Sequence, residues 1–345
     1  MVVAAIGAVG FVWRIYSSSV WGRTLTPLEQ GRVLLLGAEK AAGEAAGLTK
    51  RRVNIRARIR VLEKGVDARE QGWREAALEV SKLNDELDKV SSELKENRAK
   101  ERALLKRGIS VFSKELKHIK KPSQLEKHSG DLMLWGKALL KVGRNLQAAA
   151  VFKRLESGRI PKDRKASALN ARIAALDREM KKLKLPEAPN PAEVKSRPPK
   201  KSLPDVVRRF HDALETYVKK RPNESKAAIY AYWIGSHNYL YGRYKESGRW
   251  FRWIIKKHCR STVALEAGTL VLQSAILEKG ENYPQRLLAV VRSLRKTDCW
   301  RRRQCKKGDK KCRAWSKKVG GWMLELAEIE EHVEKRIRSQ KREKN

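Results

Sequence analysis

The chain has 345 residues, and its 78 Lys and Arg against 39 Asp and Glu give a formal net charge of +39. This balance predicts an anionic partner, such as an acidic protein, an anionic surface or a nucleic acid, and it excludes no fold. A hydrophobic fraction of 41% is low for a single compact core. Only 11 Pro and 22 Gly, and the lack of any long apolar–polar alternation, argue for helices rather than strands. We therefore expect an all-α protein made of thin, extended helical layers.

The N-terminal segment, residues 1–26, begins with an apolar stretch. Met1–Trp13 is uncharged but shorter than the roughly 20 residues that a membrane-spanning helix needs. Ser17–Ser19 offer small residues for a cleavage site, although no Lys or Arg precedes the apolar stretch. The first cysteine is Cys259, which excludes a lipoprotein signal. We interpret the segment as a signal or membrane anchor of a periplasmic or membrane-anchored protein. A buried or docking helix is the alternative, and a cytoplasmic location is the alternative for the protein.

Residues 27–130 are predicted to form long, coiled-coil-like helices. An Ala/Leu/Glu-rich helix over Pro27–Gly47 is followed by the strongly basic Leu48–Arg60, the entry into a long helix. A heptad seam follows, with alternating spacings of three and four residues: Trp73, Ala76, Val80, Leu83, Leu87, Val90, Leu94 and Asn97. This seam predicts either self-association of two chains through residues 73–97 or an intramolecular helical hairpin.

Two stretches of the chain share one order of glycines and aromatics. They are Leu132–Leu155, with Gly136, Gly143 and Phe152, and Ala228–Cys259, with Gly235, Gly242 and Phe251. The second glycine follows the first by seven residues, and the phenylalanine follows by nine more, in both stretches. Each stretch predicts two helices that turn at the second glycine and touch at the first.

These patterns divide the rest of the chain. We expect a helical hairpin unit over residues 131–185 and a set of repeats over residues 204–298. Residues 186–203, within the proline-rich break Leu185–Pro204, read as an extended linker between the two.

The stretch Ala228–Cys259 resembles a tetratricopeptide repeat (TPR). It has a first helix rich in Tyr and Trp, a small residue at the helix contact, a Gly-Arg-Tyr turn at Gly242, then Ser247 and Phe251 in the second helix. The order of apolar N-terminus, coiled coil and repeats is similar to that of periplasmic coiled-coil/TPR envelope proteins, although this chain is more basic and its repeats are degenerate. The resemblance implies a TPR-like α-solenoid that binds a peptide or helix of another protein.

The first helices of TPR hairpins line the inner face of the array, so the resemblance also implies candidate partner-binding residues. These groove candidates are Tyr232, Trp233, His237, Asn238 and Tyr241. Packing between adjacent hairpins is the alternative role for these side chains, above all for Tyr232.

Residues 299–345 combine cysteines, cations and tryptophans. Cys259, Cys299, Cys305 and Cys312 predict disulfides in an exported protein or free thiols in a reducing compartment. Their spacing lacks the close pairs of zinc sites, so we expect no metal. The cations beside Trp300 and Trp315 suit either phosphate contact with stacking or a solvated loop, and the anion-binding candidates are Arg301, Arg302, Arg303, Lys306 and Lys307.

Apolar residues recur at helical spacing near the C-terminus, which predicts a capping helix that closes the last repeat. They are Trp315, Val319, Trp322, Leu326, Ile329, Val333 and Ile337.

The sequence carries no HExxH, GxSxG, Walker-type or GxGxxG motif, so we expect no enzyme and no cofactor. The preferred function is a non-catalytic scaffold or adaptor that mediates protein–protein interaction, in a bacterial cell envelope. A basic nucleic-acid-binding protein and a structural subunit of a large assembly are the alternatives.

Overall fold

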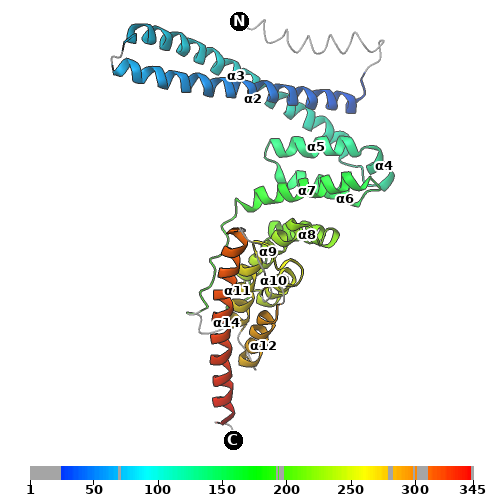
Figure 1. Cartoon of the computed structure of the whole chain (residues 1–345). Helices are drawn as coiled ribbons and strands as arrows, with labels where there is room; N and C mark the ends of the chain where they lie inside the picture. Colours follow the sequence, from blue (N-terminus) through cyan, green and yellow to red (C-terminus); the bar gives the residue numbers. More distant parts are fainter. Residues whose placement is uncertain are drawn as a thin grey trace. The chain divides into compact units, whose positions relative to one another are not determined.

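A computed structural model describes residues 25–342, except 69–70, 192, 194–197, 279–282, 298–299 and 301–309. Over these residues the protein is all-α, with 12 helices and no strand, and most helices pack against a neighbour in the sequence (Figure 1). The chain forms two compact units, residues 1–172 and residues 173–345, and the boundary lies within helix α7. The predicted signal or anchor lies almost entirely outside the described residues. None of the described helices is both long and apolar enough to cross a bilayer.

The first unit begins with an antiparallel pair of long helices, α2 (Pro27–Asp67) and α3 (Trp73–Leu116). A capping box fixes the start of α2, because the Thr26 hydroxyl accepts the Glu29 amide while the Glu29 carboxylate accepts the Thr26 amide. Gly72 takes φ +85° directly before α3, a left-handed conformation that suits glycine. Helix α2 runs unbroken through the expected junction at Gly47 and ends at Asp67.

The predicted heptad seam packs within the chain. Leu83 and Val90 of α3 are buried with Ile55 and Ile59 of α2. The seam predicted from the sequence thus forms an intramolecular hairpin, although Trp73, its first member, is 41% exposed. Arg51 of α2 also pairs with Glu86 of α3, at 2.7 Å from its Nη2 to the carboxylate.

Three short helices and the first half of a fourth complete this unit: α4 (Pro122–Lys127), α5 (Ser129–Lys141), α6 (Asn145–Ser157) and α7 (Lys162–Met180). α5 packs against both α2 and α3. The Arg32 guanidinium of α2 donates to the buried Asp131 carboxylate of α5, with Nε–Oδ1 at 2.5 Å and Nη2–Oδ2 at 2.9 Å. Arg154 of α6 donates to the carbonyls of Leu116 and Ile119, which stabilises the C-terminal end of α3.

The second unit contains the expected helices beyond the linker. They are α8 (Asp205–Lys220), α9 (Ser225–Leu240), α10 (Tyr244–His258), α11 (Ala264–Leu277), α12 (Tyr283–Arg295) and α14 (Lys310–Arg342). Each of α8 to α12 packs against the next, as in an α-solenoid, and α14 packs on α12. The stripe predicted for the capping helix faces the core, since Val319, Trp322, Leu326 and Val333 are buried with residues of α9 to α12.

Candidate functional site

The two predicted hairpins have the same turn, 99 residues apart from Gly143 to Gly242. Gly143 and Gly242 take φ +77° and +69°. The residue after each glycine donates its amide to a carbonyl five residues before it, Arg144 to Leu139 at 2.9 Å and Arg243 to Asn238 at 2.8 Å. The α5–α6 and α9–α10 pairs therefore repeat one local structure.

The contact between the two helices also repeats. A Cβ added at Gly136 of α5 would lie 2.5 Å from the ring of Phe152, and one added at Gly235 of α9 would lie 2.6 Å from the ring of Phe251. Both phenylalanines are fully buried. Glycine is required here because the aromatic ring of the second helix lies directly against the backbone of the first.

The five groove candidates, four on α9 and Tyr241 at its C-cap, point in different directions. Tyr232 lies toward α11, where its hydroxyl donates to Glu266 at 2.5 Å. Trp233 lies toward α8, with its ring stacked on Phe210 at a centroid distance of 5.9 Å. These contacts give both side chains a packing role between neighbouring helices, which the sequence left as the alternative.

The other three candidates are largely enclosed. The Asn238 side chain is 5% exposed and donates to the Ile234 carbonyl within its own helix. Tyr241, at the turn, is 7% exposed, and its carbonyl accepts the Lys201 amide from the end of the linker. His237 stacks on His211 of α8. Binding of a partner by Asn238 or Tyr241 would need their present contacts to open.

The two histidines form a neutral pair, in which His211 is buried and His237 is partly buried. Nε2 of His211 lies 3.2 Å from Nδ1 of His237, so one ring nitrogen donates and the other accepts. Burial, followed by the charges of His237 and Arg243, lowers the pKa of His211 to about 3. Burial alone lowers the pKa of His237 to about 4. The pair stays uncharged near neutral pH and holds α8 against α9.

The predicted disulfide and anion-binding residues fall partly outside the described structure. Cys259 and Cys312 are both disulfide-bonded, and Cys312 is buried. Cys299 and Cys305, and all five anion-binding candidates from Arg301 to Lys307, lie outside the described residues. Among the residues that are described, no group of three or more His, Cys, Asp and Glu side chains is placed to hold a metal ion.

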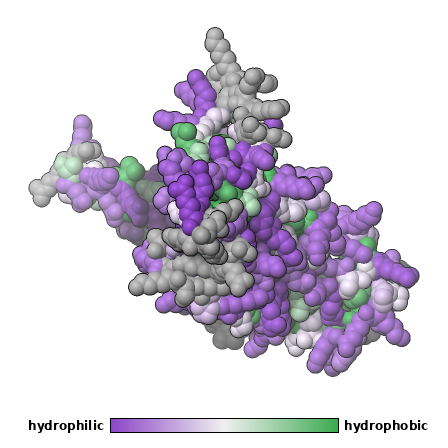
Figure 2. Space-filling view, turned by 90° about the horizontal axis from the view of Figure 1, so that it is seen from below, coloured by the Kyte–Doolittle hydropathy of each residue, from purple (hydrophilic) through white to green (hydrophobic). Residues whose placement is uncertain are grey.

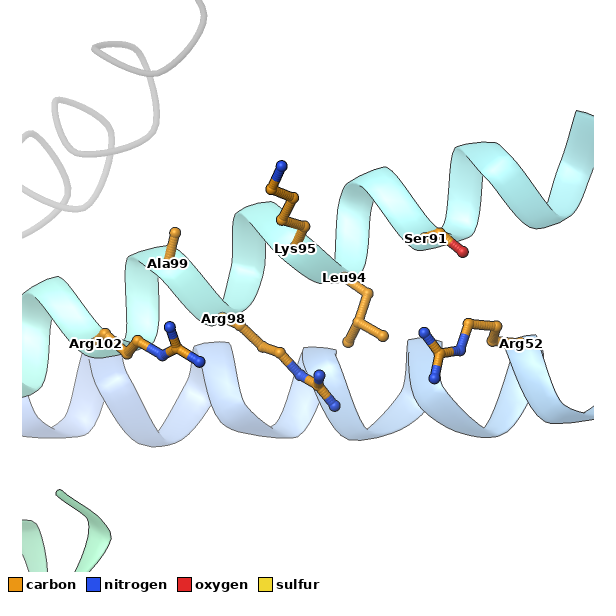
Figure 3. Close-up of a pocket in the computed structure, with 7 residues that line it drawn as sticks. All are labelled: Arg52, Ser91, Leu94, Lys95, Arg98, Ala99 and Arg102. Atoms are coloured by element: carbon orange, nitrogen blue, oxygen red, sulfur yellow. The ribbon is translucent and has the colours of Figure 1, made fainter. Parts of the chain in front are cut away.

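The long hairpin also carries a basic pocket that was not predicted from the sequence (Figure 3). It has a volume of about 350 Å³ and lies between α2 and α3, lined by Arg52, Ser91, Leu94, Lys95, Arg98, Ala99 and Arg102. Arg52 comes from α2 and the other six residues from α3. The sequence signal was present in the basic stretch Leu48–Arg60, but the α3 cations are spread along the helix and become a cluster only by helical spacing.

Hydrophilic residues cover most of the molecular face seen in Figure 2, in keeping with the high content of Lys and Arg. Searches found no protein-family model that matches the chain and no curated protein that matches it.

Proposed function

We propose that the chain is a non-catalytic helical-repeat scaffold of the TPR type, which holds another protein in an oxidising compartment such as a bacterial cell envelope. The observation that carries the proposal is the recurrence of one hairpin, with the same glycine turn and the same phenylalanine–glycine contact, in α5–α6 and α9–α10. A helical hairpin of this size buries its apolar face only by stacking on neighbours, and stacked hairpins present extended surfaces that bind other proteins.

The disulfide bonds support the proposed compartment. Structural disulfides form and persist in oxidising environments and are rare in reducing ones. Cys259 ends α10 and Cys312 lies near the start of α14, so their disulfides restrain the region where the solenoid is closed. An extracytoplasmic location disfavours nucleic acid as the ligand and favours a protein partner.

The exposed part of α9 is the surface on which we expect the partner. Ile229 is 37% exposed and lies one turn before Tyr232, whose hydroxyl reaches Glu266 of α11. The first helices of two successive hairpins therefore meet on this face, with an apolar side chain beside a tyrosine–carboxylate pair.

Site-specific photocrosslinking in cells tests the proposal. A photoreactive benzoylphenylalanine at Ile229 should give a discrete protein adduct, identified by mass spectrometry. The matched control is the same residue at Leu324 of α14, which is 69% exposed and in the same unit. Equal adducts at both positions, or adducts to nucleic acid alone, would contradict a protein-binding scaffold. Fractionation with N-terminal sequencing of the mature chain tests the compartment separately.

A further inference from the structure

One stripe of α3 changes from polar to apolar along the helix. Its members recur at alternating spacings of four and three residues: Ser91, Lys95, Arg98, Arg102, Leu105, Ile109, Phe112 and Leu116. Such spacing places all eight on one face of the helix. The last four are at most 5% exposed, whereas the first four line the basic pocket.

Helix α5 covers only the part of the hairpin near the C-terminal end of α3. Its first turn is fixed to α2 by the pair of Asp131 with Arg32, and its last residue, Lys141, lies 4.0 Å from Glu101 of α3. Beyond α5, the hairpin extends to Asp67 of α2 and Trp73 of α3 (Figure 1). The three-helix arrangement at this end of the hairpin therefore stops where the stripe becomes cationic.

Arg52 occupies an unusual place in the α2 seam. Gly31, Ala38, Ala45, Arg52 and Ile59 recur every seven residues, and the other four are buried. The Nε atom of Arg52 is itself buried and has no hydrogen-bond partner. A buried polar group without a partner is rare in native proteins, and an acceptor supplied by another molecule would satisfy this one.

The cations of the pocket lack anionic partners within the described chain. Arg52, Lys95, Arg98 and Arg102 form no salt bridge with any carboxylate in that part of the molecule, unlike Arg51 and Arg58 on the same hairpin, which pair with Glu86 and Glu79. Close like charges repel one another, so an anion in the pocket would lower the free energy of this arrangement.

We propose that this pocket binds an acidic amphipathic helix from a partner protein. The bound helix would pack beside α2 and α3 as a third helix, as α5 does farther along the hairpin. The pocket is lined by the apolar Leu94 and Ala99 and by cations at spacings of three and four residues along α3. Carboxylates at the same spacings on a facing helix would match them. The described lining contains no aromatic side chain on which a nucleic-acid base could stack. The proposal concerns the long hairpin α2–α3 and does not depend on the function of the repeat hairpins.

The test measures binding of a synthetic helical peptide to the full-length protein by fluorescence anisotropy at near-physiological salt. The peptide carries glutamates at alternating spacings of three and four residues beside leucines, and a scrambled peptide has the same composition. The variant Lys95→Gln/Arg98→Gln/Arg102→Gln removes the α3 cations of the pocket. The control Lys82→Gln/Lys89→Gln/Lys114→Gln removes three exposed lysines of α3 outside the pocket, with the same change in charge.

We expect the pocket variant to bind the acidic peptide about tenfold more weakly, and the control variant to bind it as the native protein does. Circular dichroism checks that both variants keep their helical content. Equal weakening in the two variants, or equal binding of the scrambled peptide, would overturn the proposal by showing attraction to overall charge alone. Tighter, pocket-dependent binding of duplex RNA or of phosphatidylglycerol vesicles than of the peptide would also overturn it, in favour of a phosphate-bearing ligand.

Discussion

The hairpins α5–α6 and α9–α10 share a backbone but differ in what covers their turns. Val142, before the first turn glycine, is 39% exposed, whereas Tyr241, at the same place in the second hairpin, is 7% exposed. The end of the linker accounts for the difference, since Lys201 donates its amide to the Tyr241 carbonyl. The glycines and the phenylalanine thus determine the hairpin structure, whereas the residues around them determine which other parts of the chain pack against it.

The largest expected effect tests whether the helix contact is equivalent in the two hairpins. Gly136→Leu and Gly235→Leu should each destabilise their own hairpin by about 4 kcal/mol or more, because even a Cβ meets the facing phenylalanine ring. Hydrogen exchange of residues 129–157 and 225–258 in the full chain reports the two regions separately.

A matched glycine substitution serves as the control. Gly320→Ala in α14 places a Cβ in open space and should stabilise the helix by roughly 0.5–1 kcal/mol. Normal stability of Gly235→Leu would refute the close helix contact in α9–α10.

The second prediction uses a difference between the hairpins. His237 of α9 corresponds to Ala138 of α5, so only the second hairpin contributes a histidine to a pair with His211 of α8. Because the folded pKa values of about 3 and 4 lie below the unfolded value of 6.5, the unfolded chain binds more protons at mildly acidic pH. Stability of the α8–α9 contact is therefore full above about pH 6.5 and falls as the pH decreases toward 4.

Lowering the pH from 7 to 5 should cost this region about 3 kcal/mol. Hydrogen exchange, corrected for intrinsic rates, should show the loss in α8 and α9, and His211→Leu/His237→Leu should reduce it. An equal loss in α5–α6, or an unchanged loss in the double variant, would assign the effect to other groups.

Reduction of disulfides should also affect the stability of the two units differently. All four cysteines lie at or beyond Cys259, so the first unit has none. Dithiothreitol should lower the stability of the second unit by about 2 kcal/mol or more, by releasing the restraint on Cys259 and Cys312. Urea unfolding followed by hydrogen exchange measures this loss, and an equal loss in α2–α6 would show that reduction acts indirectly.

The smallest expected effect is a difference in stability cost between substitutions at the two turn glycines. Gly143→Ala and Gly242→Ala both place alanine at positive φ, which costs about 1 kcal/mol. A Cβ at Gly242 would also lie 2.5 Å from the Pro199 carbonyl oxygen, whereas one at Gly143 meets no atom within 4 Å. Gly242→Ala should therefore cost about 1 kcal/mol more, and equal melting temperature shifts would argue against the linker contact.

Much of the helical architecture follows from local patterns in the sequence. The heptad seam, the glycine–phenylalanine spacing and the apolar stripe of α14 are all short-range signals, and apart from the exposed Trp73 the structure packs the main members of each pattern as expected. The end of α2 was harder to predict from the sequence, because the alanine-rich and arginine-rich halves form one helix without a stop signal at Gly47.

The candidate sites depend more on tertiary contacts and were harder to predict. Aromatic residues of α9 suit a binding groove and a packed interface equally well, and only the positions of α8 and α11 show that Trp233 and Tyr232 pack. Arg52 was not predicted as a site residue, because a charged residue interrupts the apolar seven-residue pattern by which the α2 seam would be recognised. Its significance depends on cations more than 40 residues away in the sequence.

The paired contacts along α2–α3 also bear on how the hairpin selects its register. Two helices with seven-residue repeats can slide by one repeat and still match many apolar positions. In the observed pairing, a Cβ at Gly31 would lie 2.8 Å from the Phe112 ring and one at Gly108 would lie 2.6 Å from Leu35. A shift by one heptad would set Phe112 against a residue with a side chain and move Arg52 along the apolar seam. A shifted alignment is thus destabilised both by steric overlap at Phe112 and by the displaced charge of Arg52, which favours one pairing of the two helices during folding.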